Sequence, residues 1–178
     1  VARCYFELQQ YDKAIDACDY AIISDEEFAE AYVVKGHAFY QLGNDKKALE
    51  NYRKAEKMQV LTHDFIYTFI AMGHISQNEW DKAYDYLEAA IDNYQEKTIP
   101  LSMLYSNAAL CLLKMGEKKK AYQYCQKAIN ADPNDVENYL MSGRIYMEDQ
   151  KPQEAVREWA KALNMSPYPE TWNEIGLI

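Results

Sequence analysis

Small and bulky residues return along the chain in one fixed pattern. An alanine is followed four residues later by a bulky residue or cysteine, and three residues after that by a second alanine. The pattern occurs five times, with its first alanine at Ala14, Ala48, Ala83, Ala121 and Ala155. Offsets of four and seven residues share one face of an α-helix, so each occurrence predicts an amphipathic helix with a buried small–bulky–small stripe.

A second helical pattern precedes four of these stripes. A tyrosine is followed four residues later by Gly or Ala, and three residues after that by a large residue. These tyrosines are Tyr32, Tyr67, Tyr105 and Tyr139. Gly43 and Gly116 follow two of the patterns and suit the left-handed end of a helix. Each unit is therefore predicted to be a helix, a short turn and a second helix.

The units follow one another along the whole chain, since the first alanines are 34, 35, 38 and 34 residues apart. We predict one all-α array with a partial unit at 1–28, full units at 29–62, 64–97, 102–135 and 136–169, and the start of a further unit at 170–178. Stacked helix pairs share a continuous core that one pair alone cannot form. The chain opens as a helix interior and closes on the apolar "IGLI", so we expect both ends to be cut from something longer.

These units resemble the tetratricopeptide repeat (TPR) family, whose pattern is W-x2-L-G-x2-Y, then A-x3-F-x2-A, then P. The "WNEIG" at Trp172 is similar to the first part of that pattern. Tyrosine replaces the first tryptophan in the four full units, and Val60 and Gln95 stand where proline would end a unit. The resemblance implies a right-handed superhelical α-solenoid of antiparallel helix pairs, in which the first helix of each pair lines a concave groove.

Composition and charge narrow the choice of partners. Hydrophobic residues make up 49% of the chain and charged residues 26%, which is typical of an ordered, well-buried protein. The net charge is −9 and no segment is strongly basic, which argues against nucleic acid. We expect no membrane span, because no apolar run is long enough. Charge runs such as "SDEEF" at Ser24 and "EKKKA" at Glu117 are expected to be solvated faces and helix starts.

The reactive side chains do not form a convergent set. By register His74 falls in the core, His63 in a loop and His37 on the groove wall, and no two have metal-ligand spacing. The sequence contains no glycine-rich phosphate loop and no nucleophile elbow. We therefore predict a protein that is not an enzyme, with no catalytic residue, no metal site and no cofactor.

The four cysteines form two pairs in the same register. Cys4 and Cys18 are 14 residues apart, as are Cys111 and Cys125, so each pair places one cysteine on each helix of a unit. A disulfide and a metal site are both alternatives at such positions, but no C-x2-C spacing occurs. We expect four small buried hydrophobic side chains instead. Free buried thiols favour a reducing compartment, so we expect a cytoplasmic location.

The groove-facing positions of the first helices are the candidate binding residues that the resemblance implies. Register assigns this role to Val34, His37, Phe65, Phe69, Met72, Asn107, Leu110, Lys114, Met141 and Arg144. The aromatic and methionine-rich members predict an apolar trough that suits a peptide or a partner helix. The polar members Asn107, Lys114 and Arg144 suit a peptide backbone or a carboxylate. In the alternative interpretation, the apolar members contact neighbouring units, or the protein's own flanks fill the groove.

One TPR subfamily grips the acidic C-terminal tail of heat-shock chaperones with a clamp of Lys, Asn and Arg. The corresponding positions here read Val33, His37, Phe69, Met103 and Asn107, or, starting one unit later, Thr68, Met72, Asn107, Glu137 and Met141. Only Asn107 matches the clamp. We therefore do not expect this chain to bind chaperone tails.

The predicted function is a protein–protein interaction scaffold or adaptor that binds a peptide or partner helix in an apolar concave groove. Two alternatives stay open. The chain is a structural scaffold that forms a homo-oligomer through its end helices, or it is a regulatory TPR arm of a larger protein whose other domain is absent.

Overall fold

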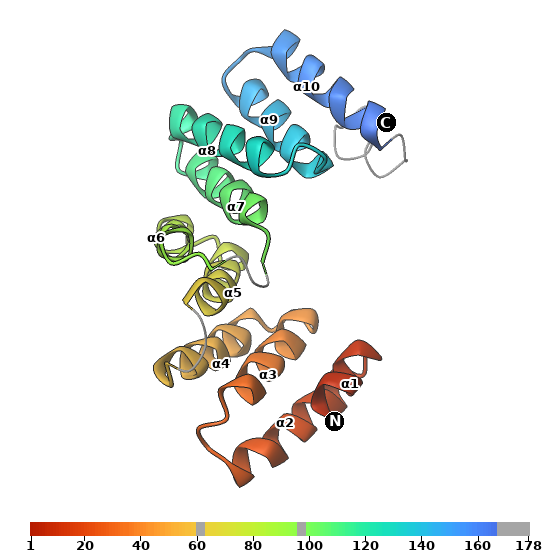
Figure 1. Cartoon of the computed structure of the whole chain (residues 1–178), viewed down its shortest axis with the longest axis vertical. Helices are drawn as coiled ribbons and strands as arrows, with labels where there is room; N and C mark the ends of the chain where they lie inside the picture. The colour runs from red at the N-terminus through yellow and green to blue at the C-terminus, as the bar shows by residue number, and fades with distance from the viewer. Residues whose placement is uncertain (60–62, 96–98, 167–178) are drawn as a thin grey trace. The chain divides into compact units, whose positions relative to one another are not determined.

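The structure is a computed structural model that describes residues 1–59, 63–95 and 99–166 (Figure 1), and in these ranges it contains ten α-helices and no β-strand. The helices are α1 (Ala2–Glu7), α2 (Tyr11–Ser24), α3 (Ala29–Gln41), α4 (Asp45–Lys57), α5 (His63–Ser76), α6 (Trp80–Asp92), α7 (Leu101–Lys114), α8 (Lys118–Ala131), α9 (Val136–Glu148) and α10 (Pro152–Met165). The predicted all-α class is confirmed. The further unit predicted at 170–178 lies outside the described residues.

The helices belong to two compact units, residues 1–95 and residues 96–178. The first unit contains the pairs α1–α2, α3–α4 and α5–α6, and the second contains α7–α8 and α9–α10. The loop predicted at His63 is wrong, because His63 is the first residue of α5. That helix begins a full turn before Tyr67, as α7 does before Tyr105.

One turn motif joins the two helices of every pair. Gly43 and Gly116 have φ angles of 71° and 81°, so their predicted left-handed conformation is confirmed. Gln9, Asn78 and Gln150 adopt the same conformation at the other three turns, with φ between 56° and 58°. In each turn the amide of the following residue bonds a carbonyl five residues back, over 2.8–3.0 Å. This pattern satisfies the last carbonyls of the first helix and reverses the chain at once.

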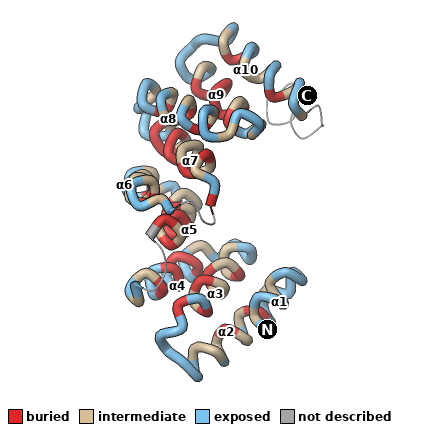
Figure 2. Tube along the Cα trace, viewed as in Figure 1, coloured by how far each residue is buried: buried red, intermediate tan, exposed pale blue. Residues whose placement is uncertain are grey.

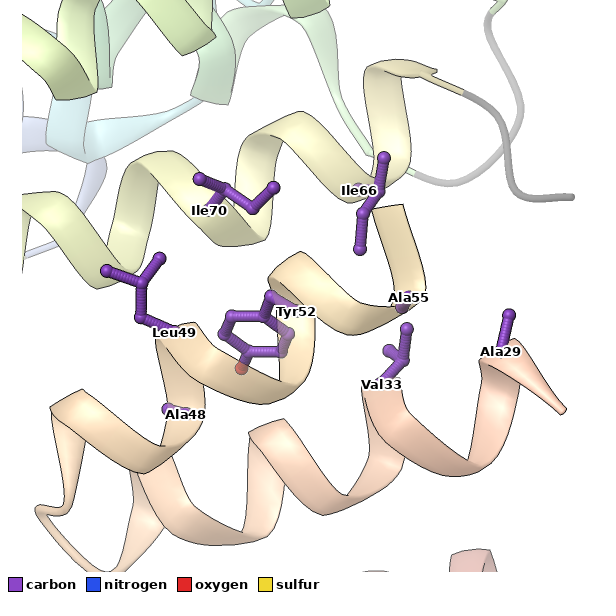
Figure 3. Close-up of a cluster of buried hydrophobic side chains, with 8 residues drawn as sticks. All are labelled: Ala29, Val33, Ala48, Leu49, Tyr52, Ala55, Ile66 and Ile70. Atoms are coloured by element: carbon purple, nitrogen blue, oxygen red, sulfur yellow. The ribbon is translucent and has the colours of Figure 1, made fainter. Parts of the chain in front are cut away.

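The repeated stripes form the core of the two units. In α4, α6 and α8 both alanines and the residue between them are buried, whereas Ala21 of α2 and Trp159 of α10 are half-buried. Figure 2 shows buried stretches on α3 to α5 and on α7 to α9, while α1 has none. Figure 3 shows the cluster that α3, α4 and α5 share in the first unit, made of Ala29, Val33, Ala48, Leu49, Tyr52, Ala55, Ile66 and Ile70.

Small residues in the first helices make room for the bulky residues of the stripes. A Cβ atom added to Gly36 would lie 2.4 Å from the ring of Tyr52, and one added to Gly143 would lie 2.1 Å from the indole of Trp159. Both distances are far below a normal carbon contact, so the two helices of the pair approach each other only because these positions are glycine. The small residue of the first helix and the bulky residue of the second are therefore in direct contact. We call this contact within a helix pair a joint.

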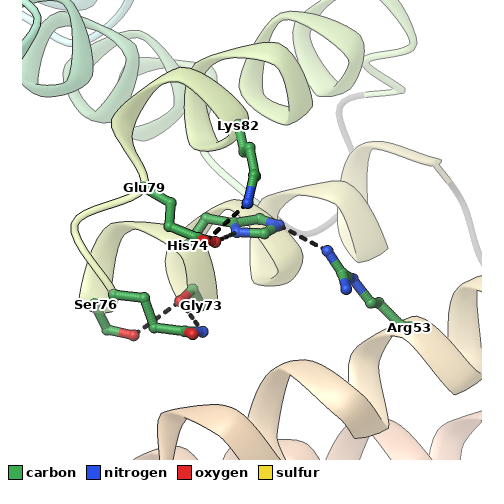
Figure 4. Close-up of polar contacts among 7 residues, drawn as sticks. Arg53, Gly73, His74, Ser76, Glu79 and Lys82 are labelled. Atoms are coloured by element: carbon green, nitrogen blue, oxygen red, sulfur yellow. Dashed lines mark hydrogen bonds and ion pairs between the residues drawn. The ribbon is translucent and has the colours of Figure 1, made fainter.

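A polar cluster connects neighbouring pairs in the first unit (Figure 4). The buried His74 of α5 bonds the Glu79 carboxylate through Nδ1 at 2.5 Å and the Arg53 guanidinium of α4 through Nε2 at 3.3 Å. Lys82 donates to the other oxygen of Glu79 at 2.8 Å. Because a guanidinium only donates, Nε2 accepts and Nδ1 carries the proton. The core position predicted for His74 is confirmed. Both of its ring nitrogens form hydrogen bonds within the fold.

Candidate functional site

The first helices of the first unit line a hollow of about 270 Å³, whose surface is apolar for the greater part. It lies among α1, α3 and α5, and its lining residues are Arg3, Phe6, Glu7, Glu30, Val33, Val34, His37 and Phe65. Three of the residues predicted for binding are among them, namely Val34, His37 and Phe65. A hollow of this size accepts one large side chain or a few backbone atoms of a peptide.

His37 provides an uncharged polar edge in this hollow. Its Nδ1 lies 2.8 Å from the hydroxyl of Tyr52, and its ring lies 4.3 Å from that of Phe69 and 6.0 Å from that of Phe6. Burial lowers the pKa of His37 to about 4, so the imidazole is neutral at pH 7. Burial also raises the pKa of Tyr52 far above its usual range, so the hydroxyl keeps its proton.

Phe69 and Met72 lie outside the lining of this hollow. The Phe69 ring packs against the rings of Phe65, Tyr52 and His37 at centroid distances of 4.9, 5.6 and 4.3 Å. It is therefore largely engaged by the residues around it, as the alternative interpretation of the sequence expects. Met72 is half-buried.

A second hollow, of about 470 Å³, lies in the second unit between α7, α9 and the turn that joins α8 to α9. Its lining contains Pro100, Ser102, Met103, Ser106, Asn107, Leu110, Asp132, Asp135, Glu137, Met141 and Arg144. Four residues predicted for binding are therefore in this lining, and the exposed Lys114 is not. The single trough predicted from the sequence involves residues of both compact units, and it stays a prediction.

Carboxylates at the edge of the second hollow also serve the chain turn. The Asp132 carboxylate accepts the amide of Asn134 at 3.0 Å, and the Asp135 carboxylate accepts the amide of Glu137 at 3.0 Å, which caps α9. Met103, Leu110 and Met141 supply the apolar part of the lining. The second hollow thus combines adaptable apolar side chains with the carboxylates of the turn and the guanidinium of Arg144.

The sequence analysis missed the contribution of α1 to the first hollow. Arg3, Phe6 and Glu7 lie 34 residues before His37, Tyr40 and Gln41, which are groove positions of the first full unit. The same register extended one unit toward the N-terminus would have found them. In the second unit, Asp132 and Asp135 had no such signal, because turn residues lie outside the helical register.

Three of the four cysteines behave as expected. Cys18, Cys111 and Cys125 are fully buried free thiols, and burial raises their pKa values to about 11, 12 and 12. The prediction is wrong for Cys4, which is exposed because no described helix covers that side of α1. Within the described residues, no group of three or more His, Cys, Asp or Glu side chains is placed to hold a metal ion. None of the described helices is both long and apolar enough to cross a membrane.

Helix pairs joined by the same turn and stacked through small residues define a helical-repeat protein. Family models described as "Tetratricopeptide repeat" match residues 2–59 and 102–135. The chain belongs to the TPR family, and its resemblance to that family is confirmed.

Known proteins with similar sequences or structures support the fold. The chain is 27% identical to the DnaJ homolog subfamily C member 7 homolog of Dictyostelium discoideum, over 93% of this chain and 33% of that protein. It is similar to PilW, a type IV pilus biogenesis factor, with a TM-score of 0.86 and 18% identity over 98% of this chain and 83% of PilW. It is also similar to YrrB, described as "a TPR protein with an unusual peptide-binding site", with a TM-score of 0.77 and 17% identity over 99% and 89% of the two chains. The chain spans a little over a third of the length of the first curated relatives it matches.

Proposed function

We propose that this chain is a non-catalytic interaction scaffold that binds peptide segments of partner proteins on the first helices of its repeats. TPR proteins generally mediate protein–protein interaction, and the finer proposal rests on one observation. The first helices α1, α3 and α5 line a hollow in which apolar side chains and a neutral His37 stand beside the charged Arg3, Glu7 and Glu30. A site of this kind takes an apolar anchor side chain and holds it by burial.

The second hollow extends the proposal to the second unit. Met103, Leu110 and Met141 suit an adaptable apolar contact, and Asn107 and Arg144 add polar groups beside it. We infer that a partner segment places apolar residues in each hollow. YrrB, which has a similar fold, is described as a TPR protein with a peptide-binding site.

We further infer that the segment is not gripped by a carboxylate clamp. Two of the clamp positions are already engaged in the structure: His37 bonds Tyr52, and the buried Thr68 donates to the carbonyl of Asp64 at 2.6 Å. Phe69 lies among packed rings, and only Asn107 supplies a clamp-type side chain in a hollow. We infer that such a chain recognises a partner segment mainly by burying its apolar side chains, rather than by binding its C-terminal carboxylate.

The test selects binders from a phage-displayed library of short random peptides and measures their affinity for two matched variants. Val34→Glu places a charge in the first hollow, whereas Val156→Glu places the same charge at an exposed position of α10 that lines neither hollow. We expect Val34→Glu to weaken binding about tenfold or more, because it replaces apolar surface that the anchor would contact with a longer, charged side chain. Val156→Glu is expected to bind as the parent does.

Thermal unfolding of both variants separates lost binding from lost folding. If Val34→Glu lowers the melting temperature strongly, the milder Val34→Ala is used in its place. Selected peptides that bind Val34→Glu and a Met103→Glu variant as tightly as the parent would place the site elsewhere and overturn the proposal. The same conclusion follows if the library yields no binder above background.

A further inference from the structure

A basic pocket of about 470 Å³ lies in the second unit and shares no lining residue with the hollow between α7 and α9. The second helix α8, the end of α9 and the turn before α10 form it. Its lining consists of Lys118, Lys119, Tyr122, Gln123, Ile145, Tyr146, Asp149 and Lys151. The sequence "EKKKA" at Glu117, which was expected to be a solvated helix start, supplies two of these lysines.

The pocket is positively charged in an acidic protein. Its lining has three lysines and one aspartate, which gives a formal charge of +2, whereas the whole chain carries −9. Lys151 pairs with Asp149 at 2.6 Å, and Lys118 donates to the backbone carbonyl of Glu148. The Lys119 ammonium makes no hydrogen bond or ion pair with any described residue, so it is free to bind an anion.

Aromatic and aliphatic side chains stand beside these cations. The rings of Tyr122 and Tyr146 lie 5.3 Å apart between centroids and are tilted by 58°, and Ile145 is buried next to them. A pocket for a simple inorganic anion needs only positive charge and hydrogen-bond donors. An apolar wall of this extent fits a ligand that carries an aromatic or aliphatic group close to its negative charge.

The first turn of α8 departs from a rule that the other second helices follow. Asp12, Asp45, Asp81 and Glu154 place a carboxylate in the first turns of α2, α4, α6 and α10. The first turn of α8 has no acidic residue and contains Lys118, Lys119 and Lys120 instead. Lysines at this end face the positive pole of the helix dipole, which is unfavourable until an anion neutralises them. Glu117 at the N-cap of α8 pairs with Lys120 at 3.5 Å and so offsets one of the three lysines, which leaves Lys119 without a carboxylate partner among the described residues.

We propose that this pocket binds an acidic segment of a partner protein, with a carboxylate at Lys119 and Lys118 and an adjacent apolar side chain on Tyr122 and Tyr146. The long-range field of the chain repels acidic peptides, so binding must arise from the local charges of the pocket. The lysines bind carboxylates as point charges, which suits a segment rich in Glu or Asp more than one particular arrangement. This interaction uses the second helices and does not depend on the two hollows of the first helices.

The experiment titrates the intact protein with two peptides, acetyl-Glu-Glu-Phe-Glu-Glu-amide and its counterpart with Gln in place of Glu, while backbone amides are followed by NMR. We expect the acidic peptide alone to shift the amides of residues 118–123 and 145–151, and its affinity to fall as salt is added. Lys119→Gln is expected to weaken binding about threefold or more at low salt. Lys120→Gln is the matched control, because Lys120 is in the same helical turn but outside the lining, paired with Glu117 at 3.5 Å.

Three results would overturn the proposal. Equal weakening by Lys119→Gln and Lys120→Gln would show diffuse attraction to the helix start rather than a pocket. Equal shifts from both peptides would show that carboxylates are not recognised. Shifts with inorganic phosphate and none with the acidic peptide would assign the pocket to a small anion. Both lysines are exposed, so neither variant is expected to alter folding, and circular dichroism checks this directly.

Discussion

His37 illustrates how one side chain can belong to the core and to a binding hollow. The sequence places it on the groove wall, and the structure adds a hydrogen bond to Tyr52 and contacts with the rings of Phe69 and Phe6. Burial holds its pKa near 4, below the ordinary value of 6.5. The neutral ring can be buried against apolar groups, which a charged imidazolium could not be at the same cost. The His37 side of the hollow therefore stays uncharged at physiological pH.

The depressed pKa of His37 predicts how stability depends on pH. Between pH 6.5 and about 4 the unfolded chain binds a proton at this residue and the folded chain does not, so stability falls as the pH falls through that window. The slope from this one group is at most about 1.4 kcal/mol per pH unit. Urea unfolding at pH 7 and pH 5 measures the change in the free energy of unfolding between these two pH values. His37→Gln is expected to reduce the difference between the two pH values, and an NMR titration that gives His37 an ordinary pKa would contradict the interpretation.

At the scale of helices, Asn138 fixes the end of α8 from the neighbouring helix α9. The side chain is fully buried, donates to the carbonyls of Ala128 and Asp132 at 3.2 Å, and accepts from the Ser106 hydroxyl of α7 at 2.6 Å. The Ala128 carbonyl, in the last turn of α8, also accepts the amide of the C-cap Asp132 at 2.9 Å, and the Asp132 carbonyl lies beyond the last of these helical bonds. Three helices of the second unit therefore meet at one amide.

The sequence carries a signal for this role that register alone reveals. The positions equivalent to Asn138 in the other full units are Ala31, Ile66 and Leu104, which are all buried and apolar. A polar residue at a position that is otherwise apolar must find partners within the fold. Which partners it finds follows from the packing of α7, α8 and α9, and the sequence pattern does not predict them.

We expect Asn138→Leu to lower the free energy of unfolding, although leucine occupies the same register at position 104. The substitution leaves the half-buried Asp132 carbonyl and Ser106 hydroxyl without this partner, which is expected to cost about 1–3 kcal/mol in total. Ser106→Ala removes one of the three bonds and is expected to cost less. Chemical denaturation of both variants measures the difference. A leucine variant as stable as the parent would show that the amide network is dispensable.

At the scale of the whole molecule, the two compact units each contain their own joints between small and bulky residues. Gly36 meets Tyr52 in the first unit, and Gly143 meets Trp159 in the second. In repeat proteins each element is stabilised mainly by its neighbours, so damage at one joint is expected to remain local. The repeated sequence thus specifies a series of local interactions rather than one central core.

Native-state hydrogen exchange on Gly36→Ala and Gly143→Ala tests this expectation. Each added Cβ forces the facing ring to move, which is expected to destabilise its joint by about 1–3 kcal/mol. Exchange should accelerate mainly in α1 to α6 for Gly36→Ala and mainly in α7 to α10 for Gly143→Ala. Gly73→Ala is a milder control, because its Cβ would lie 3.3 Å from Leu49. Uniform acceleration along the chain in both variants would show a single cooperative unit instead.

The sequence by itself determined the helix pairs, the two glycine turns and most of the buried stripe, because each follows from local spacing that repeats about every 34 residues. It also identified seven of the residues that line the two hollows, since register carries the facing positions from unit to unit. Tertiary structure decided the rest. Phe69 is engaged by neighbouring rings, Cys4 is exposed, and Lys119 lies in a pocket with Tyr146 of another helix. Spacing along one helix fixes which residues share a face, but only the packed neighbour determines whether that face is covered, hollow or charged.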